Sequence, residues 1–436
     1  MTPEALKKYV GVLFLSGYHT LPRQRLYWEG QRDTLVGVLA NSISRNTFEK
    51  LKRYTHLADN NNLEVGVKFA KVMPLYNLAN KSLKQFGCFH NSYSIDEQII
   101  PYTGRHSAKQ TNREKVVRFG FKNFVLTGAD GYCYHIIPYE GAKTGSAGPG
   151  TSGKDLTVRI VYDLLLEVDD CDRSLTTFDN WYSSSGLVAS LGLLGIACRA
   201  TARADRIGTP PVLSNPVLKS SDRGTMSKAQ SKEFPLTVVK WKDNAVVTVL
   251  SNCDLVKEND TVQRWDRSAK AFVNIDRPAS IQYYNKNMGG VDYLDRGVAE
   301  YRIKIRSKKW WYPHFTNTLS VLMFSSWKLF KLANPDTDLD FLGYLRCITC
   351  FYLDEKKYQC EKGNNRKFPR KTKKKSFWRV DASIRLNGGN HWPDRVFGTY
   401  GLRCAMPGCS RRSRTVCNAC QVGYCVGSCW AQAHTP

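Results

Sequence analysis

The sequence predicts an α/β protein with a mixed sheet, a β-rich insertion, helical segments before and after the sheet, and a small cysteine-rich end. Three observations carry this prediction. From Tyr93 onward, short runs of alternating apolar residues are interspersed with runs of helical spacing. Helical patterns dominate the chain before and after this stretch. Six of the 14 cysteines fall between Cys404 and Cys429.

Residues 1–90 are predicted to be mostly helical. Thr2 and Pro3 form a helix start, with Thr as the N-cap and Pro at the first helical position. Apolar spacing from Leu6 to Leu15 supports one helix, and a second is expected to begin near Ser44. We assign this region to the first part of a split helical domain, whose expected roles in dimerisation and DNA binding rest on the family resemblance and the basic segments described below.

Residues 91–204 are predicted to form the first part of the α/β core. Alternation over 94–100 and 119–126 predicts strands, and the turn signal at 128–131 predicts a hairpin whose second strand covers 132–137. Helices are expected at 156–166 and 185–194, on either side of a short buried strand at 175–178.

The remainder divides into four predicted segments. Residues 205–280 are expected to be a β-rich insertion with a hairpin at 236–250, and residues 281–300 the second part of the core. Strand pairing is predicted to resume at Tyr283, followed by helices from Gly290. Residues 301–384 form the second helical part with a basic linker, which we expect to pack with residues 1–90. Residues 385–436 form a cysteine-rich zinc-binding domain.

Composition limits the classes of function. The net charge of +26 in 436 residues indicates a polyanionic partner, of which nucleic acid is the commonest. No apolar run approaches about 18 residues, so we expect no membrane span, and we identify no secretory signal. Scattered cysteines without such a signal indicate a reducing compartment, and Cys347, Cys350 and Cys360 are interpreted as buried thiols.

Three carboxylates are candidates for a metal-dependent site. Asp96 lies in a predicted strand, Asp179 ends a second strand, and Asp292 begins a helix. Carboxylates from several elements can converge on two divalent cations about 4 Å apart, as in phosphoryl transfer. Each also has an ordinary interpretation, since Asp179 could be a helix N-cap and Asp292 a favourable charge in a first helical turn.

Four strings of residues resemble piggyBac-type transposases and the proteins derived from them. They occur in the order typical of these proteins: Ser94-Ile95-Asp96-Glu97-Gln98, Gly120-Phe121-Lys122, Phe178-Asp179-Asn180-Trp181-Tyr182-Ser183 and Tyr284-Asn285-Lys286-Asn287-Met288-Gly289-Gly290-Val291-Asp292. The resemblance extends from about residue 4 to the cysteine-rich end. Members of the family usually carry an acidic, disordered segment before the helix at Thr2, and this sequence begins without one, which is compatible with a truncated copy or a shortened gene model.

The resemblance implies an RNase H-like catalytic core of the DDE/D type, with Asp96, Asp179 and Asp292 binding two Mg²⁺ or Mn²⁺ ions and Asp295 assisting. It implies cut-and-paste transposition on double-stranded DNA: nicking at the terminal repeats of an element, hairpin formation, and joining into TTAA target DNA. Since two ends must be cut together, we expect a homodimer. No small-molecule substrate is expected.

Basic segments are the predicted DNA contacts. Residues 301–380 hold 19 Lys/Arg and six Asp/Glu, a net charge of +13, which is half of the charge of the whole chain. Such a density favours phosphate contact with salt-sensitive affinity. The run 369–375 also resembles a nuclear-import signal, so we expect a nuclear protein. A solvated strand face is the alternative for the cations near Asp96. The residues concerned are Lys109, Arg113, Lys115, Arg118, Lys122, Arg302, Lys304, Arg306, Lys308, Lys309, Lys371, Lys373, Lys374 and Lys375.

The cysteine-rich end has the ligand spacing of zinc sites. The paired thiols and one histidine supply seven ligands, one fewer than two tetrahedral sites need, and His391 is the candidate eighth. We expect two Zn²⁺ ions in a cross-brace, in which alternate ligand pairs share each ion. Arg411 and Arg412 in this segment suggest DNA or histone contact. The predicted ligands are His391, Cys404, Cys409, Cys417, Cys420, Cys425, Cys429 and His434.

Two other functions remain compatible with the sequence. The first is a domesticated, sequence-specific DNA-binding protein that keeps the fold without using its catalytic residues. The second is a RING-type ubiquitin ligase, which rests on the cross-brace spacing alone and leaves the three aspartates without a purpose.

Overall fold

The computed structural model describes residues 2–111, 117–141, 144, 156–166, 175–254, 259–353, 380–389, 391–395 and 401–435. The chain divides into two compact units, residues 1–360 and 361–436. The sequence prediction set this boundary between residues 384 and 385. Several predicted residues lie outside the described ranges, namely Arg113, Lys115, Cys360, Lys371, Lys373, Lys374 and Lys375.

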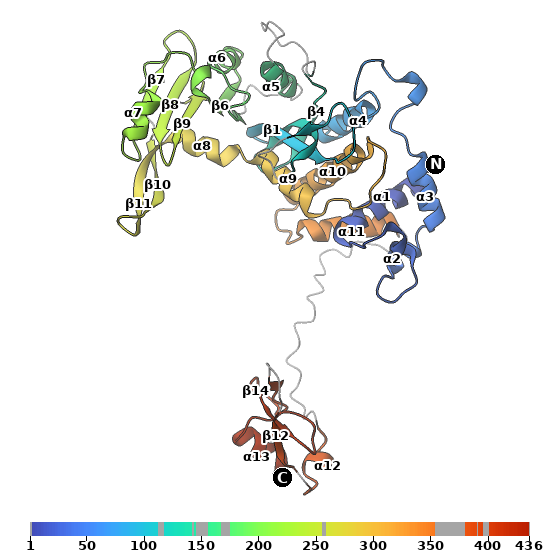
Figure 1. Ribbon diagram of the computed structural model, residues 1–436. Helices are drawn as coiled ribbons and strands as arrows, with labels where there is room; N and C mark the ends of the chain where they lie inside the picture. The colour runs from blue at the N-terminus through green and yellow to red at the C-terminus, as the bar shows by residue number, and fades with distance from the viewer. Residues whose placement is uncertain are drawn as a thin grey trace. The chain divides into compact units, whose positions relative to one another are not determined.

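A mixed nine-stranded sheet forms the centre of the larger unit (Figure 1). Its order is β2-β3-β1-β5-β6-β9-β8-β7, with β4 also paired to β3. Strand β1 runs antiparallel to β3 and parallel to β5, and β5 runs parallel to β6. The strands are β1 (Ser92–Pro101), β2 (Gln110–Thr111), β3 (Phe119–Gly128), β4 (Cys133–Pro138), β5 (Leu175–Phe178), β6 (Ala197–Thr201), β7 (Met226–Gln230), β8 (Thr237–Lys242) and β9 (Val246–Ser251).

Helices begin where the sequence predicts them in the first region. Thr2 Oγ1 accepts a hydrogen bond from the Ala5 amide at 3.2 Å, and Ser44 Oγ accepts one from the Thr47 amide at 3.2 Å. Both therefore serve as N-caps. No helix in the described ranges is long and apolar enough to cross a membrane. The helices of this unit are α1 (Pro3–Tyr18), α2 (Gly37–Ala40), α3 (Arg45–Tyr54), α4 (Met73–Lys84), α5 (Leu156–Leu166), α6 (Ser185–Leu193), α7 (Asn215–Ser220), α8 (Ala279–Asn287), α9 (Gly290–Glu300), α10 (Tyr312–Ala333) and α11 (Phe341–Leu353), with short 3-10 helices at Gln24–Trp28, Asn60–Asn62 and Ala204–Arg206.

The N-terminal helices pack against helices that follow residue 300. Helix α1 lies along α11, and Figure 1 shows α1 and α3 (blue) on the same side of the sheet as α10 and α11 (orange). Tyr9 and Phe48 share one apolar core with Trp311 and Phe324, and this core extends to the sheet. A Cβ at Gly17 would lie 2.3 Å from the Tyr301 carbonyl oxygen, which shows how closely the two parts approach.

The insertion continues the main sheet. Strands β8 and β9 form the predicted hairpin, and β9 pairs with β6 of the core. A separate antiparallel ribbon, β10 (Asn259–Asp266) and β11 (Ala271–Pro278), extends beyond it (Figure 1).

The prediction that strand pairing resumes at Tyr283 is wrong, because residues 279–287 form helix α8. Ile281 and Asn287 are buried and Tyr284 is half-buried, whereas Gln282 and Tyr283 are exposed. This burial follows helical rather than strand spacing.

The smaller unit is built from short elements around eight cysteine and histidine side chains. Strand β12 (Pro393–Arg395) pairs with β15 (Thr415–Cys417), and β13 (Leu402–Arg403) pairs with β14 (Arg412–Ser413). Two helices, α12 (Ala382–Arg385) and α13 (Ser428–His434), complete it. Its apolar core is small and consists largely of the thiols with Val380, Tyr424 and Ala433.

Candidate functional site

The register of β1 and β5 brings Asp96 and Asp179 level with each other. The two strands are parallel neighbours in which Ile95 pairs with Phe178. Asp96 follows Ile95 directly, and Asp179 follows Phe178 directly. Helix α6 is capped by Ser184, whose Oγ accepts from the Leu187 amide at 3.2 Å. Asp179 is therefore not the N-cap of this helix, and that interpretation is wrong.

Helix α9 lies against the face of β1 that carries Asp96. Ser94 Oγ donates to the Met288 carbonyl at 2.6 Å, and Gln98 Nε2 donates to Asp295 Oδ1 at 2.6 Å. Since side chains alternate along a strand, Ser94, Asp96 and Gln98 share one face. Asp96 thus faces the helical stretch between Met288 and Asp295, and Asp292 lies in that stretch.

A glycine permits this close approach. A Cβ at Gly290 would lie 2.5 Å from the Gly128 carbonyl oxygen and 2.5 Å from Thr127 Oγ1. Any other residue would push the first turn of α9 off the sheet. Asp292 follows two residues later, in that first turn. The three carboxylates therefore occupy the placements that the sequence predicts: a strand, a neighbouring strand end and a helix start.

Backbone amides hold two of the three carboxylates. The Glu97 amide donates to Asp96 Oδ1 at 2.7 Å, and the Trp181 amide donates to Asp179 Oδ1 at 2.8 Å. Asp96 is buried, Asp179 is half-buried and Asp292 is exposed. The site is therefore accessible to solvent on the side of Asp292 and shielded from solvent on the side of Asp96.

The carboxylates of Asp96, Asp179 and Glu97 lie close enough to Tyr182 to affect the pKa of its hydroxyl. Burial raises the pKa of Tyr182 well above its usual value, and the carboxylates of Glu97, Asp96 and Asp179 raise it further. The Tyr182 hydroxyl is buried and has no hydrogen-bond partner among the described residues. Carboxylate oxygens are the ligands that Mg²⁺ and Mn²⁺ prefer. The donor set of three carboxylates therefore fits divalent cations.

A basic cleft borders the site. Between α9 and α10 the chain is extended, with Ile303 and Ile305 buried and with Lys304, Arg306 and Lys308 exposed. These cations, the end of β1 and the first turns of α10 line a cleft of about 550 Å³. Arg302 lines this cleft and also a smaller one of about 270 Å³ beside Asp292 and Asp295. Basic side chains therefore extend from the larger cleft to the smaller one, which the carboxylates of Asp292 and Asp295 line.

Two predicted DNA contacts have partners inside the protein. Lys309 Nζ donates to the carbonyl oxygens of Lys52, Arg53 and Thr55 at 2.6–3.2 Å, and so caps the C-terminus of α3. Lys122 Nζ lies 2.6 Å from Glu97 Oε1. Of the other cations in this region, Lys109 is half-buried and Arg118 is exposed at the start of β3.

Eight side chains of the smaller unit form two clusters suited to metal ions. Within each cluster the ligand atoms all lie within 4.8 Å of one another. Cluster A consists of Cys404, Cys409, Cys425 and Cys429, and cluster B of His391, Cys417, Cys420 and His434.

The two clusters alternate along the chain, as a cross-brace requires. Each has four soft or borderline donors, which is the set and number that Zn²⁺ takes in structural sites. His391 is the eighth member, as the sequence predicts.

The histidines of cluster B are oriented by their second nitrogen atoms. His391 Nδ1 lies 3.2 Å from Cys417 Sγ, while its Nε2 donates to Asn387 Oδ1 at 2.9 Å. His434 Nε2 lies 3.4 Å from Cys420 Sγ, and its Nδ1 donates to the Trp430 carbonyl at 3.0 Å. Such outer hydrogen bonds fix the tautomer of metal-binding histidines.

The electrostatics of cluster A also favour a cation. The backbone amide and guanidinium of Arg411 lower the pKa of the Cys409 thiol to about 6. Burial and neighbouring thiols raise the pKa of Cys425 and Cys429, since adjacent thiolates repel one another. A divalent cation would relieve that repulsion. Arg411 Nη2 also lies 3.9 Å from Cys429 Sγ, whereas Arg412 Nη1 donates to the Gly401 carbonyl at 2.8 Å.

Comparisons with known proteins agree with this architecture. The family model described as "Transposase IS4" matches residues 1–327. PiggyBac transposable element-derived protein 3 of Homo sapiens is 30% identical over 441 residues, an alignment that spans all of this chain and 70% of the relative. The chain belongs to the piggyBac transposase family. PiggyBac transposable element-derived protein 2 of Homo sapiens is 28% identical, over 93% of this chain and 66% of the relative.

A solved structure shares the piggyBac fold with this chain. It is the piggyBac transposase in a synaptic complex with hairpin DNA, determined by cryo-EM. The TM-score is 0.64 at 19% sequence identity, and the match covers 98% of this chain and 88% of that chain. The fold of this piggyBac-family chain is therefore shared along nearly its whole length.

Sequence reasoning missed the residues that hold the carboxylates and that join the start of α9 to β1. Ser94 and Gln98 stand two residues before and two after Asp96, and the period of a strand could have placed them on the same face. The amide contacts of Glu97 and Trp181 depend on local backbone geometry. The sequence carries no signal for them.

Proposed function

We propose that this chain is a DNA transposase of piggyBac type that cleaves element ends with two divalent cations and transfers the freed strand into TTAA target DNA. One observation supports the proposal: Asp96 and Asp179 follow paired residues of the parallel neighbours β1 and β5, and helix α9, which carries Asp292 in its first turn, packs against the face of β1 that carries Asp96. An RNase H-like core agrees with the strand order β4-β3-β1-β5-β6, in which β1, β5 and β6 are parallel and β3 and β4 are antiparallel to their neighbours.

Asp96, Asp179 and Asp292 would hold two Mg²⁺ or Mn²⁺ ions, with Asp295 assisting. Such ions lower the pKa of a bound water and stabilise a leaving 3′-oxygen. The chain's own contribution is to fix the carboxylates before DNA arrives, through the amides of Glu97 and Trp181. The exposed side of Asp292 leaves access for a phosphodiester.

Double-stranded DNA is the proposed partner, with terminal repeats and target both bound by basic residues. Lys304, Arg306 and Lys308 would contact phosphates along the cleft that leads to Asp292. The zinc-binding unit, with Arg412, would contribute further contacts. The relative solved in a synaptic complex with hairpin DNA supports this partner and the hairpin intermediate. Cutting two ends together implies a homodimer, and the basic run at 369–375 supports action in the nucleus.

A second function has a specific observation in its favour. The two human relatives are named as transposable element-derived proteins. A chain of this kind could bind DNA in a sequence-specific way without cutting it. This alternative predicts tight DNA binding without any metal-dependent cleavage.

A nicking assay separates the two functions. The full chain is incubated with DNA carrying terminal repeats of piggyBac type in Mg²⁺ or Mn²⁺. We expect 3′ nicking that Asp96→Ala abolishes and that Asp336→Ala, an exposed aspartate after α10, leaves intact. Tight DNA binding by the wild-type chain, with no cleavage of any end sequence tested, would instead establish the DNA-binding alternative.

A further inference from the structure

Lys122 is half-buried on the face of the sheet opposite to helix α9. In the antiparallel β1–β3 pair, Glu97 stands opposite Phe124 and Ile99 opposite Lys122. Glu97 and Lys122 are therefore diagonal neighbours on one face. Their side chains are 13% and 17% exposed, and Lys122 Nζ lies 2.6 Å from Glu97 Oε1.

Three aromatic rings surround the Lys122 ammonium. Nζ lies 4.3 Å from the centroid of the Trp181 ring, 4.7 Å from that of Phe124 and 5.5 Å from that of Tyr139. A largely desolvated cation over aromatic faces is held more strongly than an exposed one. A phosphate group would have to displace both the carboxylate and the rings.

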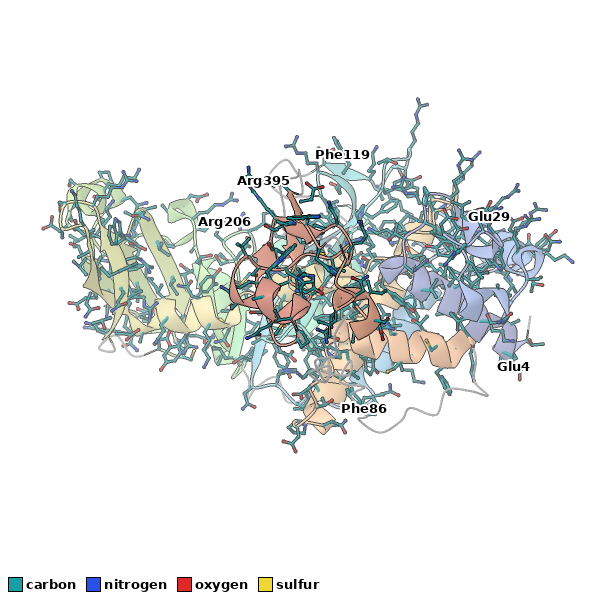
Figure 2. All side chains as sticks on the ribbon, turned by 90° about the horizontal axis from the view of Figure 1, so that it is seen from below. Glu4, Glu29, Phe86, Phe119, Arg206 and Arg395 are labelled. Carbon is teal, nitrogen blue, oxygen red and sulfur yellow. The ribbon has the colours of Figure 1, made fainter. Side chains whose placement is uncertain are left out.

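Trp181 is also fixed from its other sides. Its ring stacks on Phe124 with centroids 5.6 Å apart and planes at 15°. Arg206, labelled in Figure 2, donates from Nη1 to the Trp181 carbonyl at 2.7 Å. The position of the Lys122 ammonium therefore affects the position of the Trp181 ring and, through the ring, that of the Trp181 backbone.

Two of the side chains that contact the Lys122 ammonium, Glu97 and Trp181, belong to the residues whose backbone amides hold the proposed catalytic carboxylates. Glu97 donates its amide hydrogen to Asp96, and Trp181 donates its amide hydrogen to Asp179. We propose that Lys122 is a positioning residue: one ammonium joins Glu97 to Trp181 and thereby sets the spacing between the carboxylates of Asp96 and Asp179. This inference rests on the proposed metal-dependent function, and it replaces the DNA contact that the sequence suggested for Lys122.

The test compares Lys122→Met with a matched cation of the basic cleft, Lys308→Met. Because Lys122→Met leaves Glu97 half-buried without its cation, the double variant Lys122→Met/Glu97→Gln is included to restore folding. Lys122→Arg is the conservative variant, since arginine can pair with Glu97 and stack on Trp181. All variants are made in the full, zinc-loaded chain.

Three quantities are measured: Mn²⁺ affinity by calorimetry, DNA affinity as a function of salt concentration, and the rate of hydrogen exchange at the Trp181 amide. The Mn²⁺ binding that Asp96→Asn abolishes is assigned to this site. For the double variant we expect Mn²⁺ affinity to fall by about 10–100-fold, Trp181 exchange to accelerate, and DNA affinity to stay unchanged. Lys122→Arg should recover most of the Mn²⁺ affinity. Lys308→Met should show the opposite pattern, with weaker DNA binding and unchanged Mn²⁺ affinity.

Wild-type Mn²⁺ affinity and wild-type Trp181 exchange in the double variant would overturn the inference. So would a loss of DNA affinity equal to that of Lys308→Met. If the wild-type chain cleaves no DNA, the proposed enzymatic function fails, but the Mn²⁺ titration still decides the role of Lys122. If the wild-type chain also binds no Mn²⁺ at this site, the exchange rate of the Trp181 amide decides it.

Discussion

Gln98 donates a hydrogen bond from Nε2 to Asp295 Oδ1 at 2.6 Å. Its Oε1 accepts one from Asn317 Nδ2 at 2.7 Å, so the amide of Gln98 cannot flip without breaking both bonds. Gln98 and Asn317 are 1% and 4% exposed. Helix α10 thus fixes a β1 side chain, which in turn fixes a carboxylate of α9.

Gln98→Met is expected to reduce cleavage by about 10–100-fold, as is typical when an outer partner of a metal-site carboxylate is removed. Methionine keeps the length of the side chain and loses both hydrogen bonds. Nicking rates over a Mn²⁺ titration measure the effect, with DNA affinity unchanged. Gln263→Met, on the exposed ribbon, is the matched control. A wild-type rate for Gln98→Met would show that Asp295 needs no such support.

Gly290→Ala is expected to destabilise the protein by about 1–3 kcal/mol and to reduce nicking strongly. The added methyl would meet the Gly128 carbonyl oxygen at 2.5 Å, so α9 must move outward and carry Asp292 with it. Gly186→Ala in α6 has nothing within 4 Å and should be neutral or stabilising by up to about 1 kcal/mol. Urea unfolding and nicking of both variants check this. Equal behaviour of the two would contradict the packing described for α9.

Two zinc ions per chain are expected by elemental analysis of the purified protein. Cys404→Ser should bind one ion or fewer, because cluster A then has only three ligands and the small core depends on the metals. Cys253→Ser, an exposed thiol of the larger unit, should retain two. Chelation should raise hydrogen exchange in residues 380–435 while the larger unit keeps its protection. Two ions in Cys404→Ser would contradict the assignment of cluster A.

The buried histidine His314 is expected to make the protein less stable in mild acid. Burial, with a smaller contribution from His106, lowers its pKa from 6.5 to about 3. Its Nδ1 faces the Tyr76 hydroxyl at 2.8 Å, and its Nε2 has no partner among the described residues.

The direction of this pH dependence follows from proton uptake by the unfolded chain between pH 6.5 and 3. The contribution of neutral His314 is complete above pH 6.5 and is lost by about 1.4 kcal/mol for each pH unit below it. Urea unfolding at pH 7 and pH 5 should therefore differ by about 2 kcal/mol from this residue. His314→Gln should lose most of that difference, whereas His56→Gln, an exposed histidine, should keep it. The same difference in both variants would assign the acid sensitivity to other groups.

Sequence patterns predicted the elements around the site because local signals define them. Caps at Thr2 and Ser44, the hairpin after β3 and the ligand spacing at residues 404–429 are all local. Helix α8 was missed because its paired tyrosines favour a strand locally, while the packing of Ile281 selects a helix.

Contacts between distant residues could not be read from the sequence in the same way. Gln98 is 197 positions from Asp295 and 219 from Asn317, and nothing local relates it to them. Lys122 and Lys309 show that the partners of charged residues are equally hard to predict. From the sequence alone, a basic residue in a basic chain suggests a phosphate contact. Their carboxylate and carbonyl partners become visible only when the chain is folded.

The pairing of β6 with β9 attaches the insertion to the core through the hydrogen bonds of one sheet. From β5 the hydrogen-bonded ladder continues through β6 and β9 to β8 and β7. The insertion and the strand that precedes Asp179 therefore belong to one continuous sheet. A change in the twist of the insertion strands would change the position of β5 and, with it, that of Asp179.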